Sequence, residues 1–271
     1  MKSSALVLAQ VLLLGFSAAL SFAGEADRVA ALNAEIVTLL APYNNPVTSA
    51  KIVFSKVTVN ESRAVELAFS VSLHKKGTKG EASLEIPELR YHFPEAGGEP
   101  ELVGKLALKF DVLSVVTQEQ VNEMGPSADR WVKEFADEYA RKYKGAARVD
   151  ARITHKEVDD KGNLKALGLA LEGEIDLAKL PPDRKPEDEV LRAIKIEASG
   201  DLKGVDLTLA AIFNPNAEQF KKDGEGLKEL LEKLLARDPK LMKDIVKYAE
   251  QIDQWAIYVV GGERGLGSLI K

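Results

Sequence analysis

Residues 63–73 read RAVELAFSVSL, and every second side chain in this stretch is large and apolar. The apolar positions are Val65, Leu67, Phe69, Val71 and Leu73, and the residues between them are small or polar. Such strict alternation is typical of a β-strand that buries one face and leaves the other to solvent. The stretch therefore predicts a long strand in a sheet that is covered on one face.

Similar patterns, bounded by turn-forming residues, predict further strands on both sides of this one. The complete set spans residues 50–59, 63–74, 81–93, 102–116, 147–158, 163–177, 191–200 and 203–213. In the first strand Ile52 and Phe54 alternate on one face, whereas Val57 and Val59 alternate on the other. A β-bulge at Ser55 would account for this change of parity.

Apolar residues at helical spacing predict helices over 25–41, 118–144, 217–236 and 239–260. In the helix over 118–144, Gly125-Pro126 allows a break, after which Ser127 would be the N-cap of a restarted helix. The last helix is expected to begin with Asp238 as its N-cap and Pro239 in its first turn.

Two glycines, Gly224 and Gly226, weaken the middle of the helix over 217–236. A helix that served only as packed core would be more stable with alanine at these positions. The glycines therefore favour a helix that can move as a lid.

These elements predict an α+β fold, namely a large antiparallel meander sheet of about eight long strands with amphipathic helices on one face. The 11-residue strand would be about 36 Å long and the 22-residue last helix about 33 Å, so the helix can lie along the strands. The outward positions are polar or small, as at Lys105, Asp111 and Arg152. Only one face of the sheet therefore needs cover.

The order of elements also repeats, since a helix and four strands are followed by another helix and four strands. The segments after each set of strands, TQEQVNEMG (117–125) and NAEQFKKDG (216–224), share three of nine residues. We expect one domain over 24–271 whose halves, 24–145 and 146–271, arose by internal duplication.

The first 23 residues predict a signal peptide. Lys2 precedes the apolar run ALVLAQVLLLGF (5–16), and Ser21-Phe22-Ala23 offers small residues to a signal peptidase, so the mature chain should begin at Gly24. An uncleaved membrane anchor is the alternative, because residues 5–23 carry no charge. The chain contains no cysteine, which fits a secreted bacterial protein, periplasmic in a Gram-negative cell. After cleavage we expect no integral membrane segment.

The charges are balanced and mixed along the chain. There are 37 Lys+Arg and 42 Asp+Glu residues, for a formal net charge of −5. No basic patch or interleaving of basic and aromatic residues is present in the sequence, which argues against nucleic acid as a partner.

The residues that could support catalysis or metal binding are few. The three histidines, His74, His92 and His155, show no zinc-pair spacing and favour surface positions. Three carboxylates on one strand face, Glu172, Glu174 and Asp176, form the best metal candidate, but a solvated outer face explains them better. We therefore expect no catalytic residue, no cofactor and no metal site.

An aromatic residue recurs every four positions in the second helix, at Trp131, Phe135, Tyr139 and Tyr143. An aromatic binding platform is one interpretation of this spacing. The favoured interpretation is a stripe that faces the core.

Two functions fit these features. In the first, the sheet curls, the helices act as a lid, and the groove between them binds or carries a hydrophobic molecule such as a lipid. In the second, the helices fill the face completely, and the protein is a structural or interaction module that binds an envelope protein. An enzyme is a weaker third alternative. For the first, the expected ligand-binding residues are Leu67, Phe69, Val71, Leu108, Phe110, Leu207, Leu209 and Trp255.

Overall fold

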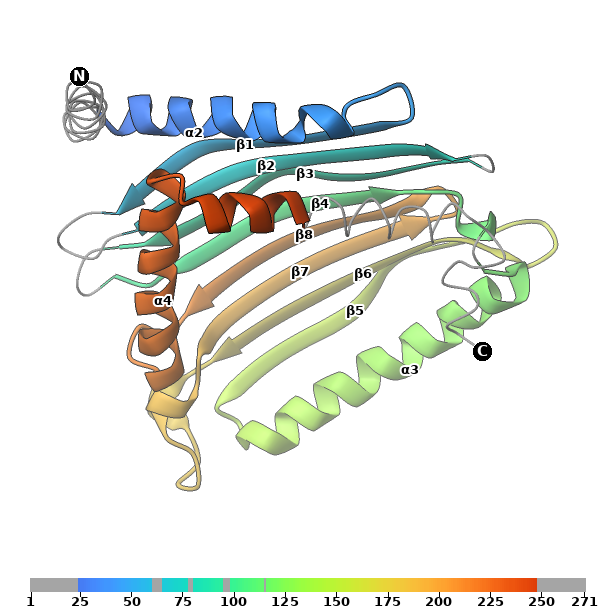
Figure 1. The fold of residues 1–271 in the computed structure, drawn as a ribbon. Helices are drawn as coiled ribbons and strands as arrows, with labels where there is room; N and C mark the ends of the chain where they lie inside the picture. Colours follow the sequence, from blue (N-terminus) through green and yellow to red (C-terminus); the bar gives the residue numbers. More distant parts are fainter. Residues whose placement is uncertain (1–23, 60–64, 78–79, 95–97, 115, 248–271) are drawn as a thin grey trace, which may run out of the picture.

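The structure, a computed structural model, describes residues 24–59, 65–77, 80–94, 98–114 and 116–247. Within these ranges, eight strands form one antiparallel sheet in the order β1-β2-β3-β4-β8-β7-β6-β5 (Figure 1). The strands are β1 (Thr48–Val59), β2 (Val65–Gly77), β3 (Gly80–Phe93), β4 (Glu101–Lys109), β5 (Ala147–Val158), β6 (Leu164–Ile175), β7 (Leu191–Asp201) and β8 (Gly204–Phe213). The α-helices are α2 (Glu25–Leu40), α3 (Gln118–Tyr143) and α4 (Glu218–Leu235). The predicted fold class is confirmed.

Apolar side chains line up across the sheet on its inner face. One row consists of Phe54, Phe69, Leu89, Gly104, Leu209, Ile196, Leu171 and Ala151, each paired with the next across neighbouring strands. A second row consists of Val57, Leu67, Tyr91, Leu102, Ala211, Ile194, Gly173 and Val149. The alternation seen in residues 63–73 thus continues, in register, through all eight strands.

The helices pack against the two edges of this face. Helices α2 and α4 lie against β1, and α3 lies against β5 and β6 (Figure 1). The main core forms where α2 meets β1 and β2, and Leu32, Ile36 and Leu40 of α2 are each no more than 1% exposed. Leu231 of α4 is buried in the same core to 1%. Complete burial of one such side chain contributes about 1.5–3 kcal/mol, so this edge is a principal source of stability.

The predicted bulge in β1 is confirmed, because the β1–β2 register shifts between Phe54 and Lys56. Asn33 of α2 holds the bulge: its Nδ2 donates to the carbonyl of Phe54 at 2.8 Å, and its Oδ1 accepts from the Phe54 amide at 2.9 Å. Asn44 binds the backbone of Ala50 in the same way: its Nδ2 donates to the Ala50 carbonyl at 3.2 Å, and its Oδ1 accepts from the Ala50 amide at 2.8 Å. Since β1 is an edge strand, these two asparagines occupy backbone groups that would otherwise be open to another chain.

The two halves of the sheet repeat one another. In β5 the register shifts between Ile153 and His155, so Thr154 occupies the same place in that 12-residue strand as Ser55 does in the 12-residue β1. Each half is a four-stranded meander, and the halves meet where β4 pairs with β8. The repeated topology and the repeated bulge favour the internal duplication.

The fourth predicted strand, 102–116, is wrong beyond Lys109. Residues Val112–Ser114 form a 3-10 turn, η2, instead of extending β4. The neighbouring strand β8 begins at Gly204, opposite Lys109, so later residues have no strand partner. The amides of Phe110 and Val112 bond to the carbonyls of Lys203 and Leu202 in the turn before β8, but no strand lies beside this segment, and it folds into a turn.

Helix α3 is continuous through Pro126, so the break and the restart at Ser127 did not occur. It begins at Thr117, whose side chain accepts a hydrogen bond from the Gln120 amide in a capping box. A residue before proline is normally excluded from helical geometry by contact between its Cβ and the proline ring. Gly125 has no Cβ, which explains how the helix accommodates the proline.

The start of the last predicted helix is confirmed. Asp238 Oδ1 accepts from the amides of Lys240 and Leu241, at 2.9 and 3.1 Å, and the helix runs from residue 239 to 247, where the description ends. The rest of that prediction, including Trp255, lies outside the described residues, as does the predicted signal peptide. In the described ranges, no helix is long and apolar enough to cross a membrane.

Candidate functional site

Helix α4 runs across the strands near their ends (Figure 1). A groove lies beneath this helix, lined by its side chains, by the start of β2 and by the end of β3. Its volume is about 500 Å³. Its apolar lining comes from Val65, Tyr91, Phe93, Pro215, Phe220 and Leu227. Charged side chains of α4, among them Lys221, Glu225 and Lys228, stand at its rim. Concave, largely apolar sites of this size are typical of small-molecule binding.

Three aromatic rings, those of Tyr91, Phe93 and Phe220, line this groove, and Phe213 packs against two of them. Phe220, which is 7% exposed, stacks on Phe93 with ring centroids 5.6 Å apart and on Phe213 at 5.4 Å. Tyr91 meets Phe213 edge-on at 6.4 Å. Each such pair contributes about 0.5–1.5 kcal/mol in addition to the free energy gained from burying its surface. These ring contacts hold the wall in place without a ligand.

Gly224 opens the groove on the helix side. A Cβ placed on Gly224 or Gly226 would meet no atom within 4 Å. Close packing therefore does not require glycine at either position. Gly224 lines the groove, and a bare backbone there leaves room beside Phe220.

The residues that the sequence singled out for ligand binding lie on the inner face but not in this groove. Leu67, Phe69 and Val71 pack against the core beneath α2, and Phe69 contacts the ring of Phe54 at 5.6 Å. The remaining described members are half-buried, with Leu207 opposite Leu106, Leu209 opposite Gly104, Leu108 opposite Val205, and Phe110 just beyond β4. Their role in ligand binding stays a prediction.

The sequence pattern did not single out the aromatic residues of the groove as ligand-binding residues. Alternation near the end of β3 does place Tyr91 and Phe93 on one face, and Phe220 belongs to the apolar stripe of α4. What the pattern does not contain is the crossing of α4 over the ends of β2 and β3. That contact joins segments more than 100 residues apart, as between Phe93 and Phe220.

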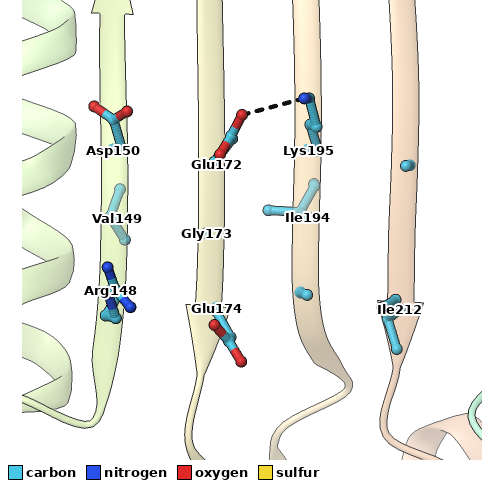
Figure 2. A pocket seen from close by; sticks show the side chains of 11 residues that line it. Arg148, Val149, Asp150, Glu172, Gly173, Glu174, Ile194, Lys195 and Ile212 are labelled. Carbon is cyan, nitrogen blue, oxygen red and sulfur yellow. Dashed lines mark ion pairs between the residues drawn. The ribbon is translucent and has the colours of Figure 1, made fainter.

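The outer face of the sheet is polar, and its charges pair with one another. A depression of about 480 Å³ lies over β5–β8, with Asp150, Glu172 and Lys195 side by side (Figure 2). Lys195 Nζ lies 3.3 Å from Glu172 Oε1, and hydrogen bonds to Glu197 and Glu172 raise the pKa of Lys195. Asp150, Glu172 and Lys195 each have an oppositely charged neighbour, which weakens the case for a charged ligand at these three residues.

The three carboxylates weighed as a metal site are engaged separately. Glu172 pairs with Lys195, and Asp176 pairs with Lys179 at 2.8 Å and accepts from the Ala178 amide, while Glu174 is exposed. Among the residues that the structure describes, no three His, Cys, Asp or Glu side chains are grouped closely enough to hold a metal ion. The absence of a metal site at these carboxylates stays a prediction.

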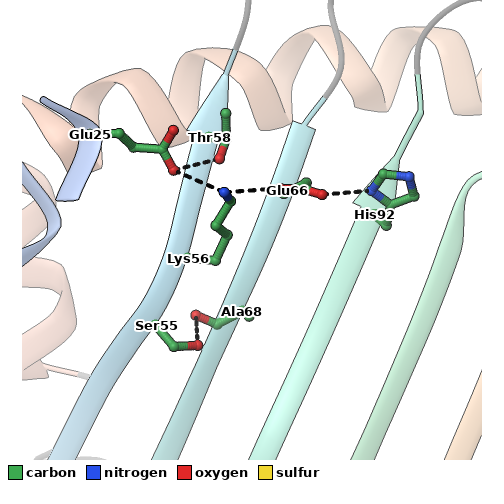
Figure 3. Close-up of polar contacts among 7 residues, drawn as sticks. All are labelled: Glu25, Ser55, Lys56, Thr58, Glu66, Ala68 and His92. Atoms are coloured by element: carbon green, nitrogen blue, oxygen red, sulfur yellow. Dashed lines mark hydrogen bonds and ion pairs between the residues drawn. The ribbon is translucent and has the colours of Figure 1, made fainter.

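A second polar network ties α2 to the sheet (Figure 3). Thr58 Oγ1 donates to Glu25 Oε1 at 2.6 Å, and Lys56 lies 3.7 Å from Glu25 and 3.3 Å from Glu66. The hydrogen bond to Glu66 and the charge of Glu25 raise the pKa of Lys56. His92 Nδ1 lies 3.4 Å from the same Glu66, which places this histidine in a surface network.

The other two histidines also lie beside glutamates near the surface. His74 is 4.0 Å from Glu81, and His155 is 3.8 Å from Glu157. None of the three histidines lines the groove beneath α4.

The aromatic stripe of α3 faces the core only at its C-terminal end. Tyr143 is 3% exposed, whereas Trp131 is 46% exposed, so the prediction of a core-facing stripe is wrong for Trp131. The rings stack along the helix at 4.9 to 5.3 Å, from Trp131 through Phe135 and Tyr139 to Tyr143. Because β5 is the last strand of the sheet, the outer side of α3 has no further strand to pack against.

Tyr143, the last residue of α3, takes part in a buried polar cluster with the loop before β7. Its hydroxyl donates to Glu189 Oε2 at 2.9 Å, and Glu189 is 8% exposed. Arg184 pairs with the other carboxylate oxygen of Glu189, and its guanidinium lies 4.6 Å from the Tyr143 ring centroid. The three side chains thus join α3 to the loop that precedes β7.

Two tyrosines should make the protein sensitive to alkali. Burial raises the pKa of Tyr91 from 10.0 to about 12, and burial with the Glu189 hydrogen bond raises the pKa of Tyr143 to about 12. The unfolded chain releases these protons first, so the stabilisation is complete below pH 10 and declines as the pH rises from 10 towards 12. Absorbance titration should show phenolate forming near pH 12, with one step lost in each of Tyr91→Phe and Tyr143→Phe.

Comparison of the chain with protein-family models, with curated proteins and with solved structures finds no match in any of the three. The residues and their geometry are therefore the only basis for assigning a function.

Proposed function

We propose that the protein is exported and binds or carries a hydrophobic molecule such as a lipid, with the groove beneath α4 as the binding site. The observation that carries the proposal is the aromatic groove of about 500 Å³ under α4, a continuous helix that contains two glycines. An apolar molecule that leaves water gains about 25 cal/mol per Å² of surface buried, and Tyr91, Phe93 and Phe220 supply the apolar wall.

The alternative, an interaction module with a filled core, has support in another part of the molecule. Leu67, Phe69 and Val71 pack against the core beneath α2. A protein filled in this way everywhere would bind partners through its surface. The two functions differ in whether an apolar probe enters the protein at all.

Native mass spectrometry of the purified protein, together with titration of the apolar fluorophore N-phenyl-1-naphthylamine, tests the proposal. We expect a co-purified lipid, or saturable binding of the fluorophore that the extracted lipid displaces. Absence of both in a folded sample would reject the carrier function in favour of the interaction module.

Replacing Gly226 with alanine should stabilise the protein by about 0.5–1 kcal/mol, because the new Cβ meets no atom and alanine favours the helix. If α4 opens to admit the ligand, the same change should slow association of the fluorophore. Urea denaturation gives the first quantity and stopped-flow fluorescence the second. Greater stability with an unchanged association rate would show that binding does not require α4 to bend.

A further inference from the structure

The connection between β6 and β7 departs from the repeated pattern of the two halves. In the first half only residues 78–79 lie between β2 and β3, whereas residues 176–190 lie between β6 and β7. This longer loop contains two 3-10 turns, η3 (Leu177–Lys179) and η4 (Pro186–Asp188). Loops that exceed what a connection needs are often functional, so this addition calls for a physical explanation.

The loop contributes to the buried polar groups of the fold. Within the described ranges, the buried polar or charged residues are Glu189, at 8% exposure, and Asn214, at 2%. Glu189 is held by Tyr143 and Arg184, and removing charges from water is costly unless they are paired in this way. Such a cluster is better suited to fixing one arrangement of α3 and the loop than to adding net stability.

Asn214 continues the connection from the loop to α4. Its Nδ2 donates to the carbonyls of Pro186 and Glu189, at 2.7 and 3.0 Å. Its Oδ1 accepts from the Asn216 amide at 3.1 Å, and its own carbonyl accepts from the Ala217 amide. Ala217 is the N-cap of α4 and offers no side-chain cap, so the turn at Asn214 sets where this helix begins.

The first turn of α4 carries Phe220, the central ring of the groove wall. We infer that the β6–β7 loop positions α4 over the groove, with Glu189 as the positioning residue that joins α3 to the start of α4. The inference rests on the proposed function only in so far as the groove is the ligand site. The Tyr143 hydroxyl fixes Glu189, the Glu189 and Pro186 carbonyls fix Asn214, and Asn214 fixes the helix that covers the aromatic wall.

Hydrogen exchange of the full chain, followed by mass spectrometry, tests this positioning without a ligand. In Tyr143→Phe and in Glu189→Gln, amides at 221–225 should exchange about tenfold faster than in the native protein, since a hydrogen bond to a charged group is lost. Amides of α2 serve as the internal reference. Tyr139→Phe and Glu187→Gln, changes on the same stripe and in the same loop, are the controls and should leave both segments unchanged.

The fluorophore titration supplies the second readout, with a dissociation constant expected to be larger in the two variants than in the native protein. Equal acceleration in α2 and α4, or no acceleration in either, would overturn the inference, since the cluster would then be structural only. Faster exchange confined to α4 in a protein that binds no fluorophore would support the positioning role and reject the carrier function. Fluorophore binding that is insensitive to both substitutions, with unchanged exchange in α4, would support the carrier function and reject the positioning role.

Discussion

Replacing Phe69 with alanine should lower the free energy of unfolding by about 3–5 kcal/mol, the usual cost of truncating a packed phenylalanine. The ring of Phe69 contacts that of Phe54 in a tilted arrangement, with centroids 5.6 Å apart, and Phe69 packs against the core beneath α2, so little room exists for the structure to relax. Equilibrium denaturation in urea measures the change.

Ser70→Ala is the matched control, because Ser70 belongs to the opposite face of β2, and it should change stability by no more than about 0.5 kcal/mol. A smaller cost for Phe69→Ala, about 1–2 kcal/mol with weaker fluorophore binding, would show that Phe69 borders space open to a ligand. Negligible costs for both substitutions would contradict the inward orientation of Phe69.

Replacing Phe220 with alanine should weaken fluorophore binding at least tenfold and lower the free energy of unfolding by about 3 kcal/mol. This ring stacks on Phe93 and Phe213, so its removal takes away the centre of the groove wall as well as two aromatic contacts. Fluorescence titration and urea denaturation give the two quantities separately.

Leu230 offers the control for this change, since it lies on the same helix with 46% of its surface exposed. Leu230→Ala should alter stability by less than about 0.5 kcal/mol and leave fluorophore binding as it is. If Phe220→Ala lowered stability while binding stayed intact, the groove beneath α4 would not be the ligand site.

Local patterns were sufficient to predict the sheet and most of its boundaries. Alternation in residues 63–73 and the change of parity at Ser55 both reflect which face of a strand is buried, and both appear in the structure. The pattern was misleading at residues 110–114, which lie beside a turn and have no strand partner, and at Pro126, where Gly125 removes the expected clash. In the first place the fold offers no neighbouring strand, and in the second the residue before the proline has no side chain.

The candidate site was harder to predict because it depends on a contact between distant segments. Tyr91, Phe93 and Phe220 are each visible in the sequence as inward-facing residues, but their proximity follows from the crossing of α4 over β2 and β3. The buried cluster of Tyr143, Arg184 and Glu189 gives no periodic signal, since it joins a helix end to an irregular loop. Periodicity indicates which face a residue occupies, and the partner across that face depends on the tertiary fold.

The pairing of β4 with β8 has a consequence for the order in which the chain folds. The other strand pairs of the sheet are formed between consecutive strands, so each half contains mainly short-range pairings. The β4–β8 pair instead joins residues about 100 positions apart, as at Gly104 and Leu209. Closing so large a loop costs conformational entropy before any contact compensates for it, and such pairings slow folding. We therefore expect two meanders to form early and independently, with the seam between them as the slow step of folding.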